Sequence, residues 1–470
     1  MTRTPILFIP LVIVLTTFIR APASAWAATG VRFGVDQNLS GPAEASDPEI
    51  REVGLAASPS NPSTVVAVFS DDFPRSRDVN CRWMSSADSG RTWVPGGVTQ
   101  LILNGSQCFD ESVVADASDT FFFAYLEVLL KNRNSRQNIL VARSVDGGRS
   151  FPAFSIVASS TSSFFVDKPL LAADVGVSSP FRGTLYLSYS VLGATDTRIV
   201  VVVSRDGGVT WTGPATVSRV APFPSDEVQG SLPLVASDGT VYVLYADYRL
   251  NTGPLAIKII ASKDGGRSWS APADVAAGLP SPGAHYYLRN GDPGFGSTPY
   301  AGLVGNSFPT AAVAPDGTLT VAWTDFPNGF CVNVGGSIAC TNADVRVSVL
   351  KSGGKTWTAP TKVSDETNAT DQFLPWLAAH PNGTVSVIWL DRRLDAGNVN
   401  YNAFYTNTSD GSTFLPNVQV SSATSLVGTA SKIGEYPGLA VTPDGLIAAW
   451  PDLRDPIGHQ VFIAKGFFLP

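Results

Sequence analysis

Residues 86–93 read Ser-Ala-Asp-Ser-Gly-Arg-Thr-Trp, and this stretch decides how the chain folds. The pattern Ser-x-Asp-x-Gly-x-Thr/Ser followed by Trp or Phe returns at residues 144–151, 204–211 and 262–269. Two altered copies follow: residues 351–357 have Ser352 in place of the aspartate, and residues 409–414 are one position short. A motif that returns about every 58 residues is the signature of a repeat fold.

The motif describes a tight turn between two strands. Its aspartate carboxylate accepts backbone N–H bonds, its glycine adopts a positive φ, and its aromatic ring packs back between neighbouring sheets. These tasks are architectural, so we interpret all six copies as structural. The step from Asp264 to Ser352 is about 30 residues longer than the other steps, so one repeat carries insertions.

A second repeated element precedes each turn. In it, alternating apolar residues flank Asp-Gly or Asn-Gly, which predicts a β-hairpin. Clear copies cover residues 309–325, 375–391 and 437–452, and weaker copies start near Val53, Ser112, Pro169 and Pro233. A further alternating stretch, the turn motif and a final strand complete each repeat. Each repeat therefore supplies the four antiparallel strands of one propeller blade.

The number of blades follows from comparing the two elements. The hairpin occurs seven times and the turn motif six times, and the chain ends where the seventh turn motif should begin. The N-terminal stretch Val31-Arg32-Phe33 is similar to the missing outer strand. We therefore predict an all-β fold, a seven-bladed β-propeller of four-stranded antiparallel blades. Its last blade is closed by the N-terminal strand, which removes exposed sheet edges.

The N-terminus predicts export. Arg3, an apolar run over residues 6–19 and the small-residue pattern Ala25-Trp26-Ala27 form a secretory signal peptide over residues 1–27. The apolar run is short for a membrane span, although an uncleaved anchor is the alternative. We expect residues 28–470 to form one domain, secreted or periplasmic, monomeric and without a membrane span after signal removal.

Charge and cysteines exclude several partners. The net charge is −7 and no Lys/Arg run occurs, which argues against nucleic-acid binding. Cys81 and Cys108 lie in one repeat, and Cys331 and Cys340 lie in one loop. Two local disulfides fit export, although four cysteines allow three pairings. Metal binding is the alternative, but no CxxC or His-rich pattern accompanies them. We expect no metal and no cofactor.

The turn motif resembles the Asp box of bacterial sialidases, and the resemblance covers nearly all of the chain after residue 27. In that family the box lies away from the active site. The resemblance implies an exported glycoside hydrolase that acts on glycans, with exo-α-sialidase as the specific activity. Two features depart from the family: the sialidases have six blades, and their Phe/Tyr-Arg-Ile-Pro motif has only Phe-Pro-Arg-Ser-Arg at residues 73–77 as a counterpart.

Three arginines are candidate substrate ligands. Arg249, Arg393 and Arg454 each follow the end of a second strand, on the face of the propeller where the first strands begin. The resemblance implies an arginine triad that clamps the substrate carboxylate, and a guanidinium fork suits that task. The alternative is that each arginine pairs with the aspartate two residues earlier, as an architectural contact.

The starts of the first strands vary between repeats, so they are free to serve function. One position reads Arg51, Asp110, Asp167, Ser231, Ser307, Phe373 and Glu435, and the next reads Glu52, Glu111, Lys168, Leu232, Phe308, Leu374 and Tyr436. Retaining sialidases use a tyrosine nucleophile with a glutamate, plus a separate acid/base. The catalytic candidates are therefore Glu435 and Tyr436 for the nucleophile, with Asp72 or Glu111 as acid/base.

The insertions supply two further candidates, because Tyr286 and Arg289 could form a ligand-binding wall near blade 5. A surface loop without a ligand is the alternative. Two other functions stay open at this point. One is a non-catalytic propeller that binds a glycan or a protein partner, and the other is a different polysaccharide-degrading enzyme on the same scaffold.

Overall fold

The structure is a computed structural model in which strands make up every regular element of the described residues. The signal peptide predicted over residues 1–27 and the catalytic candidate Glu435 lie outside the described residues. The described residues are 30–41, 52–72, 79–130, 135–223, 225–249, 254–280, 286–289, 302–306, 308–329, 331–334, 337–427, 434, 436–455 and 459–469.

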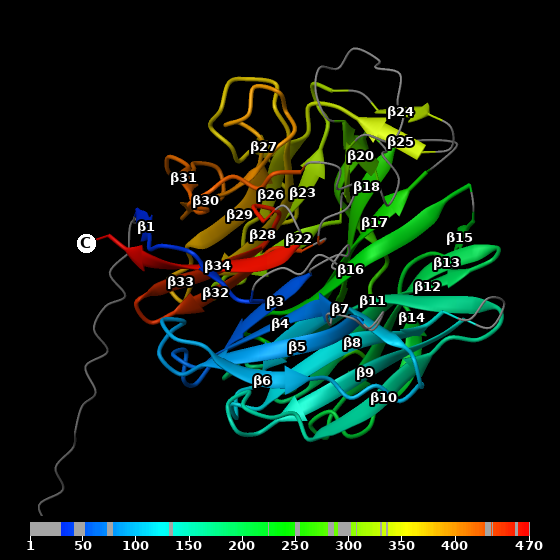
Figure 1. Ribbon diagram of the computed structural model, residues 1–470. Helices are drawn as coiled ribbons and strands as arrows, with labels where there is room; N and C mark the ends of the chain where they lie inside the picture. The colour runs from blue at the N-terminus through cyan, green and yellow to red at the C-terminus, as the bar shows by residue number, and fades with distance from the viewer. Residues whose placement is uncertain are drawn as a thin grey trace, which may run out of the picture.

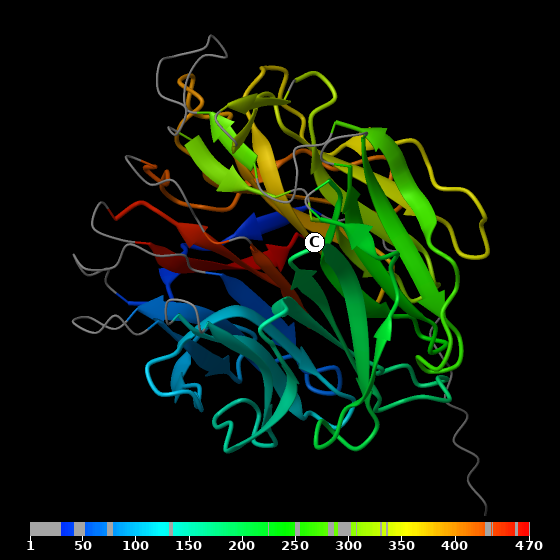
Figure 2. The same cartoon turned by 90° about the vertical axis from the view of Figure 1, so that its right-hand side faces the viewer.

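Seven four-stranded antiparallel blades form the propeller (Figures 1 and 2). Blade 1 contains β3 (Val53–Ala57), β4 (Val65–Asp72), β5 (Val79–Ser86) and β6 (Val94–Val98). Blade 2 contains β7 (Gln107–Ala115), β8 (Phe121–Leu129), β9 (Arg136–Ser144) and β10 (Ala153–Ser159). Blade 3 contains β11 (Phe164–Ala173), β12 (Leu185–Gly193), β13 (Asp196–Ser204) and β14 (Thr212–Thr216), with β15 (Ala221–Pro222) beside β13.

The remaining blades follow in order. Blade 4 contains β16 (Glu227–Val235), β17 (Val241–Tyr248), β18 (Leu255–Ser262) and β19 (Ala273–Leu279). Blade 5 contains β22 (Thr310–Val313), β23 (Leu319–Asp325), β26 (Asp344–Leu350) and β27 (Thr361–Lys362). Blade 6 contains β28 (Gln372–Ala379), β29 (Val385–Asp391), β30 (Asn402–Thr408) and β31 (Val418–Gln419).

The ends of the chain close the ring in blade 7. This blade contains β32 (Gly438–Thr442), β33 (Gly445–Asp452) and β34 (Gln460–Phe468), and the N-terminal β1 (Val31–Phe33) is its outer strand. Val31 pairs with Phe468, and β2 (Gln37–Asn38) also pairs with β34. Figure 1 shows the blue β1 beside the red β34. The predicted architecture and ring closure are both confirmed.

The first strands of the seven blades contact one another in cyclic order, from β3 through β7, β11, β16, β22, β28 and β32 back to β3. They therefore surround the central channel. The described residues contain no helix with the length and apolarity that a membrane span requires.

The Asp boxes have the predicted turn geometry. Asp88 Oδ1 accepts the backbone N–H groups of Arg91 and Thr92 at 3.0 and 2.9 Å, and Oδ2 accepts the Thr92 hydroxyl at 2.6 Å. Burial acts to raise the pKa of Asp88, but these hydrogen bonds outweigh it and lower the pKa to about 2. Because the carboxylate is used by its own turn, the box is an architectural element.

The box glycines also set the distance between blades. Gly148 has a φ of 80°, and a Cβ there would lie 2.1 Å from Val66 Cγ2 in blade 1. Gly411 approaches Val349 of blade 5 in the same way, with a Cβ distance of 2.3 Å. These two boxes therefore dock their blades onto the preceding blade through a residue that must lack a side chain.

The two insertions form one additional sheet beside blade 5. β20 (Tyr286–Arg289) and β21 (Gly302–Gly305) come from the first insertion, and β24 (Cys331–Val334) and β25 (Ser337–Cys340) come from the second. β20 pairs in parallel with β25. Cys331 lies opposite Cys340 in the ladder, and Cys340 is disulfide-bonded. Cys81 and Cys108 form the other predicted disulfide.

Candidate functional site

A β-bulge recurs where the first strands enter the channel. The strand register shifts at this point in blades 2, 3, 4 and 6. The residues in the left-handed conformation are Asp110, Lys168, Gly230 and Leu374, with φ of 55°, 51°, 67° and 52°. A non-glycine residue there costs about 1–2 kcal/mol. Bulges of this kind redirect side chains and are frequent beside active sites.

The bulge corrects one part of the sequence alignment. We had placed Glu111 in the same position as Lys168, but the shared bulge makes Asp110 the equivalent of Lys168. Gly230, rather than Ser231 or Leu232, is the equivalent in blade 4. The shift arises because a bulge inserts one residue without a partner, which an alignment of alternating residues does not register.

Lys168 lies at the centre of a buried charged cluster. Its Nζ is 3.5 Å from Asp110 Oδ1 and 3.9 Å from Glu52 Oε1, and all three side chains are at most 10% exposed. The backbone joins them further, because the Asp110 N–H donates to Glu52 Oε2 and the Lys168 N–H donates to Asp110 Oδ2. Blades 1, 2 and 3 are thus connected at the channel by two carboxylates and one ammonium group.

Aromatic side chains from the opposite blades face this cluster. Lys168 Nζ lies 4.8 Å from the centre of the Tyr436 ring and 5.3 Å from that of Phe308. Trp376 packs edge-on against Tyr436 with ring centres 6.0 Å apart. Cation–π contacts stabilise an ammonium group in such a position. Charge from blades 1 to 3 therefore meets aromatic surface from blades 5 to 7.

A small pocket of about 20 Å³ opens between these groups. The first strands of blades 3 to 7 all contribute to it, so it lies at the channel itself. Its lining includes Lys168, Asn306, Phe308, Trp376 and Tyr436. Asn306 directly follows β21, so the inserted sheet reaches the edge of the same pocket. We call this site the channel pocket.

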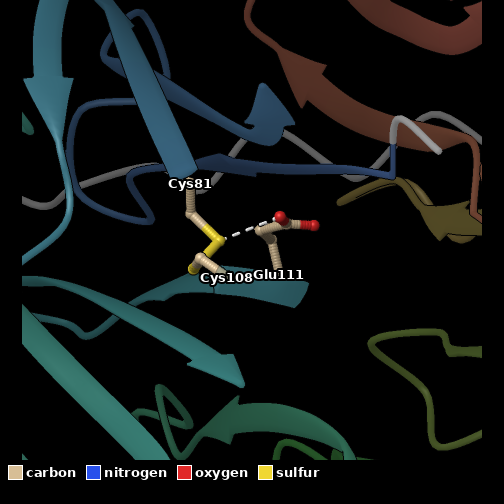
Figure 3. Close-up of side chains that lie close together, drawn as sticks. All are labelled: Cys81, Cys108 and Glu111. Atoms are coloured by element: carbon tan, nitrogen blue, oxygen red, sulfur yellow. Dashed lines mark hydrogen bonds between the residues drawn. A yellow bond between two sulfur atoms is a disulfide. The ribbon is translucent and has the colours of Figure 1, made fainter. Parts of the chain in front are cut away.

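Glu111 lies beside the disulfide that joins blades 1 and 2 (Figure 3). Its Oε1 is 3.0 Å from Cys81 Sγ. Burial, with a smaller contribution from the Asp110 charge, raises the pKa of Glu111 well above its usual range. Cys81, Cys108 and Glu111 have the ligand atoms of a metal site, but a disulfide lacks the thiolate charge that binds metal.

The three candidate arginines have separate sets of carboxylate partners. Arg249 binds Asp226 at 2.6 Å and lies 3.8 Å from Asp247. Arg454 binds Asp452 at 2.7 Å and Asp36 at 2.8 Å. Arg393 has four partners: Asp365, Glu366, Asp391 and Asn417. Such pairing with nearby carboxylates is what we expect if the arginines are architectural. It does not support an arginine triad that clamps a substrate carboxylate.

The other candidates are placed as follows. Tyr436 is buried and lines the channel pocket. Asp72 ends β4 and Tyr286 and Arg289 bound β20, but their side chains lie outside the described part of the structure. The sequence comparison left out Glu52, Asp110, Lys168, Phe308 and Trp376 as site residues. The sequence does single out Lys168. It is the one basic residue in the second series of aligned strand starts, which reads Glu52, Glu111, Lys168, Leu232, Phe308, Leu374 and Tyr436.

Comparisons with known proteins give a likeness of fold. No family profile and no curated protein matches the sequence. Among solved structures, a polysaccharide lyase has a TM-score of 0.50 at 11% identity and covers 87% of this chain and 88% of its own. An α-L-arabinofuranosidase from Fusarium graminearum has 0.49 at 16%, covering 92% and 97%. A Hadza microbial sialidase has 0.47 at 14%, covering 84% and 74%. The chain is a seven-bladed β-propeller built from Asp-box repeats.

Proposed function

We propose that this protein is an exported glycan-acting enzyme whose substrate binds in the channel pocket. One observation carries the proposal: aromatic rings of blades 5, 6 and 7 face a charged cluster of blades 1, 2 and 3 across one pocket. Aromatic rings pack against the apolar face of a sugar, and charged groups bind its hydroxyls. The Cys81–Cys108 disulfide supports export, because disulfides persist in oxidising compartments.

The chemistry of glycan cleavage needs a group that donates a proton and a group that attacks or abstracts one. Tyr436 is the side chain of our catalytic set that lines the pocket, so we assign it the nucleophile or base. Glu435, Asp72 and Glu111 remain the candidates for its partner and for the acid. Burial raises the pKa of Glu111, as a general acid requires, but its carboxyl group contacts the disulfide.

Exo-α-sialidase is the specific activity that we test first, with Arg249, Arg393 and Arg454 as carboxylate ligands and Tyr286 and Arg289 as the outer wall. The solved structures of similar fold include a sialidase, an arabinofuranosidase and a polysaccharide lyase. The test therefore includes sialosides, arabinans and acidic polysaccharides. Mass spectrometry separates the outcomes, because hydrolysis adds water across the bond and a lyase leaves an unsaturated product.

Two pocket variants and one control connect activity with the site. Tyr436→Phe removes the hydroxyl and keeps the ring, so we expect turnover to fall by about 100-fold or more. Trp376→Ala should mainly raise KM, because it removes a sugar-packing surface. Tyr242→Phe, on β17 outside the pocket, should leave both unchanged. No product from any glycan would refute the enzymatic proposal, and binding without product would favour the non-catalytic alternative. Full activity of both pocket variants would place the site elsewhere.

A further inference from the structure

A second cavity, of about 270 Å³, lies between blades 5 and 6 on the Asp-box face. Blade 5 contributes the turn at Asp316 and the strand residues Thr318 and Thr320. Blade 6 contributes its own turn at Asn382 and the Asp box at Asp410. We call it the interblade cavity. It opens on the face that carries the Asp boxes, so it is separate from the channel pocket.

The cavity exists because one side chain is small. The second residue of the second strand is Phe122 in blade 2, Tyr186 in blade 3, Tyr242 in blade 4 and Thr320 in blade 5. The strand pairing confirms the equivalence, since Tyr186 lies opposite Val203 as Thr320 lies opposite Val349. Phe122 and Tyr186 lie against the box glycines Gly208 and Gly266 of the next blade. At the boundary of blades 5 and 6 the box glycine Gly411 lies against Val349 instead, and the smaller Thr320 lines the cavity.

The turn of blade 5 leaves the mouth uncovered as well. At the boundary of blades 3 and 4, Ser179 covers Gly239, so that a Cβ on this glycine would lie 2.3 Å from the serine hydroxyl. Gly383 is the equivalent turn glycine of blade 6, and nothing lies within 4 Å of a Cβ built there. The same structural position is thus closed at one boundary and open at the other.

The lining favours a polyhydroxylated ligand. Thr320 is 1% exposed overall, and its hydroxyl has no hydrogen-bond partner among the described residues. Asn382 lines the cavity, and its Oδ1 accepts the Thr384 N–H. Lys351 Nζ donates to the Asp410 carbonyl. Asp316, whose carboxylate accepts from the Thr318 N–H and hydroxyl, also lines the cavity. The lining therefore mixes hydrogen-bond donors with acceptors, which suits sugar hydroxyls because each both donates and accepts. It also contains both positive and negative groups.

We propose that the interblade cavity binds one neutral sugar residue of a glycan, independently of the channel pocket. Its volume is below the roughly 300–1,000 Å³ of sites for drug-sized ligands, so it suits a ligand of monosaccharide size. The lining contains no aromatic side chain among the described residues, so hydrogen bonds supply the recognition and the affinity is weak. A second sugar site on the opposite face would hold a polymeric glycan while another part of it reaches the channel.

Saturation-transfer NMR with the methyl glycosides of glucose, galactose, mannose and arabinose tests the proposal. Wild type should transfer saturation to at least one of them. Thr320→Tyr fills the cavity with the side chain that blades 3 and 4 carry at this position, so it should fold normally and reduce binding at least ten-fold. Thr320→Val keeps the shape and removes the hydroxyl, and should weaken binding about five-fold.

Tyr242→Phe, on β17 outside both cavities, serves as the matched control and should leave the glycoside signal unchanged. Trp376→Ala removes a surface of the channel pocket and reports how much of the signal comes from that pocket. A loss of signal in Trp376→Ala alone would assign the binding to the channel pocket and overturn the proposal. Equal signals from wild type and Thr320→Tyr would overturn it too, as would the absence of signal from wild type with every glycoside. The sugar-site proposal is tested by binding in the Thr320 variants, and the proposed function is tested by the activity of the Tyr436 variant. Either proposal can therefore fail without the other.

Discussion

Replacing Lys168 by methionine should destabilise the protein strongly. Methionine keeps the length and the contacts with the Phe308 and Tyr436 rings but removes the ammonium group that neutralises Glu52 and Asp110. Both carboxylates are at most 10% exposed. Removing one partner of a buried ion pair costs about 3–5 kcal/mol, because the remaining charge stays buried without compensation. The backbone N–H bonds to both carboxylates persist, so we expect the lower part of this range.

A second substitution separates charge from packing. Asp110→Asn removes one of the two uncompensated charges, and asparagine tolerates the positive φ of 55° that this position has. The double variant Lys168→Met with Asp110→Asn should therefore regain about half of the lost free energy of unfolding. Asp110→Asn alone should cost little, since Lys168 still has Glu52 as a partner.

The pH dependence of the free energy of unfolding tests the buried ion pairs independently. Without the ammonium group the buried carboxyl groups resist ionisation, so their pKa values in the folded variant lie above those of the unfolded chain. The stability that their protonated forms contribute is present at low pH and is lost as pH rises. The deficit of Lys168→Met should therefore grow from pH 5 to pH 8 in urea unfolding. A loss below about 1 kcal/mol, or no rescue by Asp110→Asn, would refute the buried ion-pair cluster.

Three further predictions concern other buried groups. Glu111→Gln should match wild type below pH 4.5 and become the more stable protein as pH rises, because ionisation of the raised-pKa Glu111 then opposes folding; unfolding in urea at several pH values checks this. Burial lowers the pKa of His380 from 6.5 to about 4. Between pH 7.5 and 4.5 the free energy of unfolding of wild type should therefore fall by about 2.5 kcal/mol relative to that of His380→Gln. Parallel plots of unfolding free energy against pH for the two proteins would contradict this. Gly148→Ala should lower the free energy of unfolding by about 2–4 kcal/mol. Gly183→Ala should lower it by about 1 kcal/mol, because Gly183 also has a positive φ, of 87°, but nothing lies near a Cβ built there. Thermal unfolding of both variants checks this difference.

The repeat made the architecture predictable from sequence. Each Asp box specifies its own turn, because Asp88 bonds only to residues 86 to 92, and local contacts of this kind are visible in local sequence. The count of seven hairpins against six boxes predicted that the N-terminal stretch at Val31 completes the last blade, and Val31 pairs with Phe468 at the far end of the chain. Ring closure was predictable because the N-terminal strand had no partner in its own repeat and the last blade lacked an outer strand.

The site was less predictable, because long-range pairing decides it. The parallel pairing of Tyr287 with Ala339 joins two insertions that have no sequence feature in common. The partners of the arginines include Asp36 and Asp226, which come from loops before and between blades rather than from the aspartate two residues earlier. The bulge shifts the alignment by one position, so Asp110 and not Glu111 shares the backbone position of Lys168.

The bulge also explains how a repeat fold can carry a unique site. In a regular strand the side chains at the channel entrance would alternate between channel and blade in every repeat. At the bulge the left-handed residue departs from this alternation, and Lys168, Gly230 and Leu374 line the channel pocket from this position. Asp110, Lys168, Gly230 and Leu374 share this backbone position but not their side chains. The backbone is therefore repeated while the chemistry varies, so substitutions at these four positions should alter function more than they alter the ring itself.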